Sequence, residues 1–203
     1  MSGRRTELME NGKEWRPALE IPLETCTIRS WRKDDADSIA RLANNRAVWR
    51  NLRDRFPHPY ARKDARSWIR TARRADPQTF FAIDVEGEAV GGIGLHPQSD
   101  ILRRSMEIGY WLGEPYWGRG IATQVVVAMT RYAFEHFDIA RLYGYVFEWN
   151  PASGRVLEKA GYRLEGRLRK AVTKNGRTMD MLVYGFTEDD RAEAADGAEQ
   201  ERG

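Results

Sequence analysis

The fold is decided by the stretch from Glu107 to Thr123, which reads E-I-G-Y-W-L-G-E-P-Y-W-G-R-G-I-A-T. Its first half, up to Leu112, is rich in Ile, Tyr and Trp, which suit a half-buried strand. Gly118 and Gly120 follow a turn and directly precede a long apolar-periodic run that predicts a helix. A glycine-rich turn between a strand and a helix leaves backbone N–H groups without intrahelical partners. The stretch therefore predicts a site for a phosphate or pyrophosphate.

The two glycines alone also fit an ordinary tight turn, but two nucleotide motifs can be excluded. No Gly-Lys-Ser/Thr follows, as in a Walker loop, and the third glycine of a dinucleotide fingerprint is absent. The stretch resembles instead the acetyl-CoA pyrophosphate loop of the GCN5-related N-acetyltransferases (GNAT). It is most similar to the branch that contains RimJ and RimL, because Trp117 stands where the broad family usually has Gln or Arg.

The resemblance implies that acetyl-CoA is the acetyl donor and that no metal takes part. It implies contacts between this cosubstrate and the strand end, the loop, the first turn of the following helix and the start of a later helix. The residues concerned are Trp111, Leu112, Trp117, Gly118, Arg119, Gly120, Ile121, Ala122, Thr123, Asn150 and Ser153.

The order of the expected elements predicts an α/β (α+β) domain with a mixed sheet. We expect strands at residues 26–31, 79–85, 89–95, 104–112, 142–147, 162–172 and 178–186, and helices at residues 36–52, 61–75, 120–137 and 150–160. The resemblance runs from about Cys26 to Thr187. It implies the GNAT fold, with a mostly antiparallel central sheet that is splayed between its fourth and fifth strands and flanked by about four helices.

The two ends of the chain differ from its centre in composition. Residues 1–20 are polar and without a sustained period, so we expect a flexible N-terminal arm. Residues 188–203 contain seven acidic residues against two arginines, so we expect an acidic disordered tail. A single N-acetyltransferase domain is then expected over residues 21–187.

The amino-acid composition bears on the cellular location of the protein and on its binding partners. Cys26 is the only cysteine, so no intrachain disulfide can form and a reducing cytoplasm is expected. No apolar run approaches the roughly 20 residues that span a bilayer. The net charge of +3 suits a ligand with phosphates but does not exclude RNA. We expect acetyl-CoA and an amine acceptor as partners, without a membrane or a nucleic acid, and a homodimer stays open.

Acetyl transfer to an amine needs a group that removes a proton from the amine. Glu107 opens the central strand and is the candidate general base, acting directly or through a water. The alternative is a strand-end glutamate that pairs with Arg103 or Arg104. Of the three histidines, His58, His96 and His136, none has metal-ligand spacing.

The motif N-P-A-S, from Asn150 to Ser153, predicts the capped start of a helix. The resemblance adds that Asn150 contacts the pantetheine arm and that Ser153 protonates the leaving thiolate as general acid. Asp180 is a further candidate for holding a cationic amine, although a paired strand carboxylate is the favoured explanation. RimL-type enzymes carry another carboxylate where this chain has Val172, so the resemblance does not extend to ribosomal-protein specificity.

These residues predict an N-acetyltransferase. It would move an acetyl group from acetyl-CoA to a primary amine, either a protein N-terminal α-amine or a small-molecule amine, by direct attack in a ternary complex. The alternative is a non-catalytic sensor or assembly module that retains the CoA loop. Glu107 favours the enzyme, because a module that only binds CoA has no use for this carboxylate.

Overall fold

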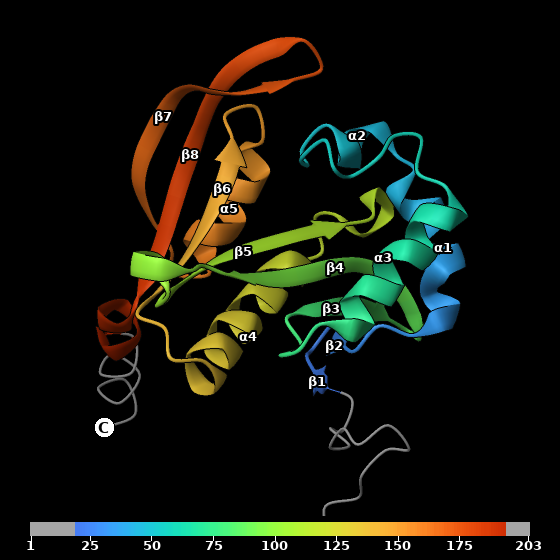
Figure 1. Ribbon diagram of the computed structural model, residues 1–203, viewed down its shortest axis with the longest axis horizontal. Helices are drawn as coiled ribbons and strands as arrows, with labels where there is room; N and C mark the ends of the chain where they lie inside the picture. The colour runs from blue at the N-terminus through green and yellow to red at the C-terminus, as the bar shows by residue number, and fades with distance from the viewer. Residues whose placement is uncertain (1–18, 194–203) are drawn as a thin grey trace, which may run out of the picture.

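All neighbouring strands but one pair run antiparallel in the computed structural model, which describes residues 19–193 (Figure 1). The sheet has eight strands in the order β1-β2-β3-β4-β5-β6-β8-β7. Their bounds are β1 Glu20–Pro22, β2 Thr27–Arg29, β3 Phe80–Val85, β4 Glu88–Pro97, β5 Ser105–Leu112, β6 Arg141–Phe147, β7 Arg163–Lys174 and β8 Arg177–Thr187.

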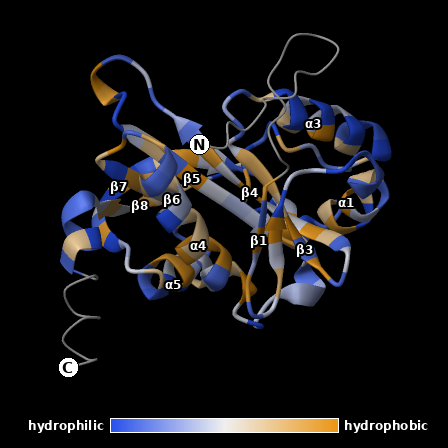
Figure 2. Ribbon diagram, turned by 90° about the horizontal axis from the view of Figure 1, so that it is seen from below, coloured by the Kyte–Doolittle hydropathy of each residue, from blue (hydrophilic) through white to orange (hydrophobic). Residues whose placement is uncertain are grey.

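Two pairs of helices cover opposite faces of this sheet (Figures 1 and 2). The α-helices are α1 Ala36–Ala43, α2 Arg46–Trp49, α3 Arg62–Arg74, α4 Ile121–His136 and α5 Pro151–Lys159, and short 3-10 turns are η1 Lys33–Asp35, η2 Asp100–Leu102 and η3 Glu114–Tyr116. Successive strand residues point to opposite faces. Phe81 of β3 therefore joins the core under α4, whereas Ala82 joins the smaller core under α1 and α3.

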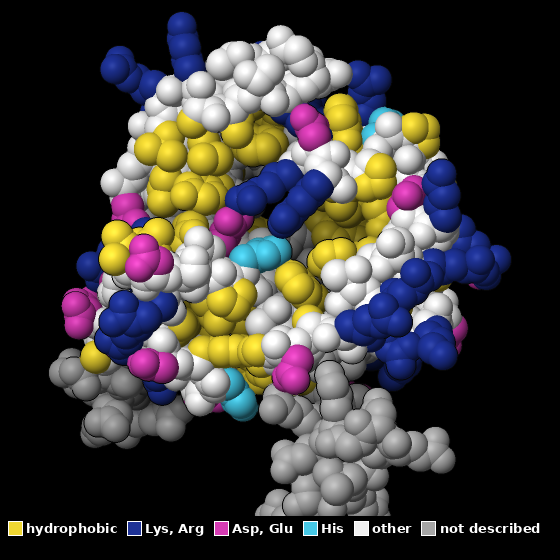
Figure 3. Space-filling view, viewed as in Figure 1, with side chains coloured by type: hydrophobic (Ala, Val, Ile, Leu, Met, Phe, Trp, Pro, Cys, Tyr) yellow, Lys and Arg dark blue, Asp and Glu magenta, His cyan; other side chains and the backbone are white. Residues whose placement is uncertain are grey.

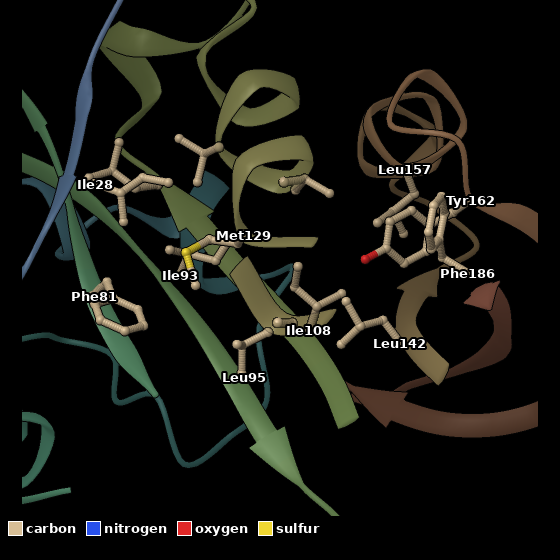
Figure 4. Close-up of a cluster of buried hydrophobic side chains, with 14 of the residues drawn as sticks. Ile28, Phe81, Ile93, Leu95, Ile108, Met129, Leu142, Leu157, Tyr162 and Phe186 are labelled. Carbon is tan, nitrogen blue, oxygen red and sulfur yellow. The ribbon is translucent and has the colours of Figure 1, made fainter. Parts of the chain in front are cut away.

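The larger core lies between the sheet and the helices α4 and α5 (Figure 4). Met129 of α4 lies over Ile93, and Leu157 of α5 lies beside Tyr162. Met129 and Leu157 are at most 1% exposed, and complete burial of such side chains contributes roughly 1.5–3 kcal/mol each. This burial fixes both helices on the sheet, and with them the helix N-termini that form the site.

The sheet opens between β5 and β6. These parallel strands pair only at Ser105 with Arg141, Met106 with Leu142 and Glu107 with Tyr143, and β6 continues against β8 instead. The splay expected between the fourth and fifth strands is confirmed. The labels differ because the structure adds the short strand β1, which the sequence analysis placed at the boundary of the arm.

The chain ends and the helices differ in detail from expectation. The described residues contain the five helices α1 to α5 and a further helical segment after β8, because the broken stretch after Asn44 forms the separate helix α2 and the acidic segment begins as a helix. Residues 188–193 are helical, and Asp190 accepts hydrogen bonds from the backbone and hydroxyl of Thr187. The ordered chain thus continues past the expected boundary at Thr187, while residues 1–18 and 194–203 lie outside the described part. No helix within residues 19–193 could cross a membrane.

Candidate active site

The glycine loop turns the chain from β5 into α4. Gly118 and Gly120 have φ angles of 74° and 77°, in the left-handed region that favours glycine. A Cβ built on either residue meets no atom within 4 Å, so the space over the loop is open. Gly120 is the N-cap of the 16-residue helix α4, whose first N–H groups have no intrahelical acceptor. The open loop at a helix N-terminus fits an anionic pyrophosphate.

Two side chains set the position of this loop. Trp117 donates from its indole nitrogen to the carbonyl oxygen of Leu112 at 2.7 Å, which ties the loop to the end of β5. The Arg119 guanidinium lies over the ring of Tyr116, 5.2 Å from its centroid. Arg119 therefore places a positive charge at the loop where a phosphate would lie.

One cleft of about 1320 Å³ connects the loop with the opening between β5 and β6. Its lining includes every residue that the resemblance implies for acetyl-CoA: Trp111, Leu112, Trp117, Gly118, Arg119, Gly120, Ile121, Ala122, Thr123, Asn150 and Ser153. Glu107 lines the same cleft. The structure thus brings all of the predicted site residues together, and their individual roles stay predictions.

Tyr110 and Ser153 meet on the α5 side of the opening. The phenol oxygen of Tyr110 lies 2.8 Å from Ser153 Oγ and 3.2 Å from the carbonyl oxygen of Ser153. Burial raises the pKa of Tyr110 to about 12, so the phenol stays protonated at neutral pH. Asn150 accepts a hydrogen bond from the backbone N–H of Ser153, as expected of a helix cap. Sequence reasoning missed Tyr110, because its partner lies 43 residues away.

Glu107 lies on the other face of the sheet and is paired. Arg53, from the loop after α2, donates from Nη2 to both carboxylate oxygens, at 2.5 and 2.7 Å. Neither partner suggested by the sequence is used: Arg103 donates to the carbonyl oxygen of Asp100, and Arg104 binds Asp138 and Glu188. The carboxylate is 16% exposed and the Arg53 side chain 52% exposed, so solvent reaches the pair from the side of Arg53.

His96 of β4 stands directly opposite Glu107 in the antiparallel pair β4–β5. Its Nε2 lies 3.5 Å and 3.7 Å from the positions that a Cβ would take on Gly94 and Gly109, so the ring lies over these two glycines at ordinary contact distance. Burial lowers the pKa of His96, Glu107 opposes this shift, and Arg55 and Arg53 add to it. No cluster of three or more metal-ligating side chains occurs within residues 19–193.

The β7–β8 hairpin reaches across the cleft to the loop after α2. Lys174, whose side chain is 2% exposed, donates to Asp54 at 2.7 Å and lies 3.6 Å from the centroid of the Trp49 ring. Figure 3 shows the hollow on this face, with a histidine beside basic and acidic side chains. Asp180 does not line the hollow. It accepts hydrogen bonds from the backbone N–H of Lys170 and from Arg167, which lower its pKa, so it is a paired strand carboxylate.

A family profile described as the acetyltransferase (GNAT) domain matches residues 26–163 of this chain. The chain belongs to the GNAT family of acetyltransferases. Membership agrees with the splayed sheet and the glycine loop. This GNAT protein is therefore an acetyl-CoA-dependent N-acetyltransferase, and the resemblance to the RimJ and RimL branch is confirmed.

Three relatives illustrate the match. The chain is 27% identical to the SPbeta prophage-derived uncharacterized N-acetyltransferase YokL of Bacillus subtilis, over 82% of this chain and 92% of YokL. It is 32% identical to the ribosomal-protein-serine acetyltransferase of Escherichia coli, over 51% of this chain and 58% of that protein. The structure of Mycobacterium smegmatis RimJ in complex with CoA-disulfide superposes with a TM-score of 0.71 at 26% identity, covering 85% of this chain and 89% of RimJ.

Proposed function

We propose that this GNAT enzyme moves the acetyl group of acetyl-CoA to a single primary amine, by direct attack in a ternary complex. The carrying observation is the one cleft that joins the glycine loop to Glu107 through the opening between β5 and β6. Acetyl-CoA supplies the acetyl group as an activated thioester. Gly118 and Gly120 would hold its pyrophosphate, and Asn150 and Ser153 its pantetheine end.

The side chains on the two faces of β5 suggest that acetyl-CoA and the amine approach each other from opposite sides of the sheet. Tyr110 and Glu107 are three positions apart in the strand, so their side chains point to opposite faces. Ser153 and Tyr110 would supply a proton to the departing sulfur on the α5 side. On the other side, loss of the ammonium proton would depend on Glu107, acting directly or through an intervening group.

The absence of a thiol at the site supports direct attack. Cys26, the only cysteine of the chain, is buried and does not line the cleft. An acyl-cysteine intermediate would need an exposed thiolate, and burial raises the pKa of Cys26. We therefore expect sequential kinetics. The reduced state of Cys26 is in keeping with a cytoplasmic location, which is part of the proposal.

The charges at the acceptor end favour a monoamine over a polyamine. Three acids line the cleft: Glu107 is paired with Arg53, Asp54 with Lys174, and Asp64 accepts a hydrogen bond from the backbone N–H of Ala61. An acceptor with several ammonium groups would find few free carboxylates there. An α-amine, with a pKa of about 8, is also partly neutral at pH 7, whereas a lysine side chain at about 10.4 is not. We propose a protein N-terminal α-amine first and a small monoamine second.

The test is release of free thiol from acetyl-CoA in the presence of peptides with free or blocked N-termini, lysine-only peptides, polyamines and aminoglycosides. We expect turnover with the free N-termini and intersecting lines in double-reciprocal plots. Binding of acetyl-CoA without thiol release for any amine would instead indicate a non-catalytic CoA-binding module.

A further inference from the structure

Glu107 is poorly placed to receive the proton itself. Both of its carboxylate oxygens already accept hydrogen bonds from Arg53, at 2.5 and 2.7 Å. A proton on the carboxylate would cancel its negative charge and so weaken both of these charge-assisted bonds, which are among the stronger hydrogen bonds in proteins. The group that takes the proton from the amine should be a neighbour with a free lone pair.

His96 has the required position. It faces Glu107 across β4–β5, so both side chains lie on the acceptor face of the sheet. Both residues line the cleft. The imidazole is seated over the paired glycines Gly94 and Gly109, and its ring meets the edge of Phe80 at a centroid distance of 5.2 Å. Phe80 and the two glycines thus form the surface on which the ring lies.

The imidazole nitrogens of His96 also have no hydrogen-bond partner among residues 19–193, although the backbone carbonyl of His96 accepts one from Gln98. The imidazole rings of the other two histidines have different surroundings. His136 uses Nδ1 to contact the carbonyl oxygen of Tyr132 at the exposed end of α4, and His58 stacks on Trp49. Only His96 among the three lines the cleft.

We propose that His96 is the proton acceptor of the acetyl transfer, and that Glu107, fixed by Arg53, stabilises the imidazolium that forms. The inference rests on the proposed function. One proton passes from the ammonium group of the acceptor to the imidazole and then to solvent. The neutral nitrogen forms its bond to the acetyl carbonyl carbon, the carbon–sulfur bond breaks, and a second proton leaves the nitrogen and ends on sulfur. The products are an N-acetyl amide, CoA thiol and one released proton.

The charges around His96 agree with this role. Burial lowers the pKa of the imidazole, as do Arg55 and Arg53 in the loop after α2, while Glu107 raises it. The imidazole is therefore neutral at pH 7 and able to accept a proton. A base of this kind takes a proton more readily from an α-amine, with a pKa of about 8, than from a lysine at about 10.4. His96 thus also favours the N-terminal acceptor.

The test combines proton NMR titration of the histidines in the full chain with steady-state kinetics. We expect His96 to titrate below its ordinary pKa, and Glu107→Gln to lower its pKa further, because the stabilising carboxylate is removed. In the pH profile of kcat/KM, the apparent pKa of the acid limb, below which the rate falls, should decrease together with the pKa of His96. His96→Gln should reduce kcat/KM by about 10² to 10⁴-fold at pH 7 and leave acetyl-CoA affinity unchanged. The control His136→Gln should leave both kcat/KM and acetyl-CoA affinity unchanged.

Three outcomes would overturn the inference. His96→Gln and His96→Asn could both bind acetyl-CoA normally and keep most of kcat/KM, or the acid limb could fail to follow the NMR pKa of His96. Alternatively, Glu107→Gln could abolish turnover at every pH while His96→Gln does not, which would make Glu107 the base. If wild-type enzyme transfers acetyl to no amine at all, the proposed function fails, and the inference fails with it.

Discussion

Arg53 and Glu107, 54 residues apart in the chain, form a two-oxygen contact at the edge of the cleft. The contact connects the loop after α2 to the strand β5, at the last residue where β5 still pairs with β6. It fixes the carboxylate directly before the opening of the sheet. Arg53 thereby holds the carboxylate of Glu107, and it is one of the charges that act on His96, together with Glu107 and Arg55.

Arg53→Gln tests this electrostatic connection. Removal of a positive neighbour favours the protonated imidazole, so the pKa of His96 should rise and the acid limb of kcat/KM should move to higher pH. Stability should change by less than about 1 kcal/mol, because Arg53 is half exposed. Arg104→Gln, which removes another exposed arginine, is the control and should leave the limb in place. A shift to lower pH in Arg53→Gln would contradict the assignment.

Gly120→Asp tests the loop. A carboxylate in the open space at the N-terminus of α4 should exclude the pyrophosphate by charge and volume, and acetyl-CoA binding should be lost in calorimetry. Gly176→Asp is the matched control, because Gly176 has a φ of 73° and equally open space but lies in the β7–β8 turn. Equal affinities in the two variants would show that the loop does not hold the pyrophosphate.

Ser153→Ala tests protonation of the leaving sulfur. We expect kcat to fall by about 10²-fold near neutral pH, and the loss to shrink at alkaline pH, where a thiol with a pKa of about 8.5 leaves without a proton. Tyr110→Phe, which removes the phenol 2.8 Å from Ser153 Oγ, should show a smaller loss of the same shape. Tyr162→Phe is the control, since that buried phenol contacts Thr130 outside the cleft. A pH-independent loss in Ser153→Ala would exclude the acid role.

The shapes of the glycine loop and of the helix start at Asn150 could be predicted, because their signals are local. Gly118 and Gly120, which adopt positive φ angles, lie directly before α4. Asn150 is the cap of α5. Each signal therefore lies within a few residues of the helix that it starts. The hairpins and α4 could be predicted for the same reason. The helix after β8 was missed, because its capping contact through Asp190 is hidden in an acidic segment that composition marks as disordered.

The acceptor side could not be predicted in the same way. The sequence offered Arg103 and Arg104 as partners of Glu107, but the partner is Arg53, which tertiary packing of the loop after α2 brings to the strand. The sequence around His96 lacks metal-ligand spacing and gives no other local sign of a role. The available signal was the register of β4 and β5, which places His96 opposite Glu107 and Gly94 opposite Gly109.

Asp190→Ala tests the ordered start of the acidic segment. Asp190 is 10% exposed, accepts two hydrogen bonds from Thr187 and pairs with Arg163 at 2.9 Å. Its loss should reduce the free energy of unfolding by about 1–2 kcal/mol, as for a helix cap. Glu193→Ala removes a 66% exposed partner of the same arginine and should cost less than about 0.5 kcal/mol. Equal midpoints in urea for wild type and Asp190→Ala would contradict this account.

The central claim is acetyl transfer from acetyl-CoA to a primary amine, and the most direct measurement is the mass of the acceptor. A peptide with a free N-terminus is incubated with the enzyme and with acetyl-CoA that carries an isotope-labelled acetyl group, and fragment masses locate the label. We predict one labelled acetyl group per peptide, on the α-amine, and none when the N-terminus is blocked. An acceptor mass that stays unchanged for peptides and small monoamines alike, while the protein binds acetyl-CoA, would contradict the claim.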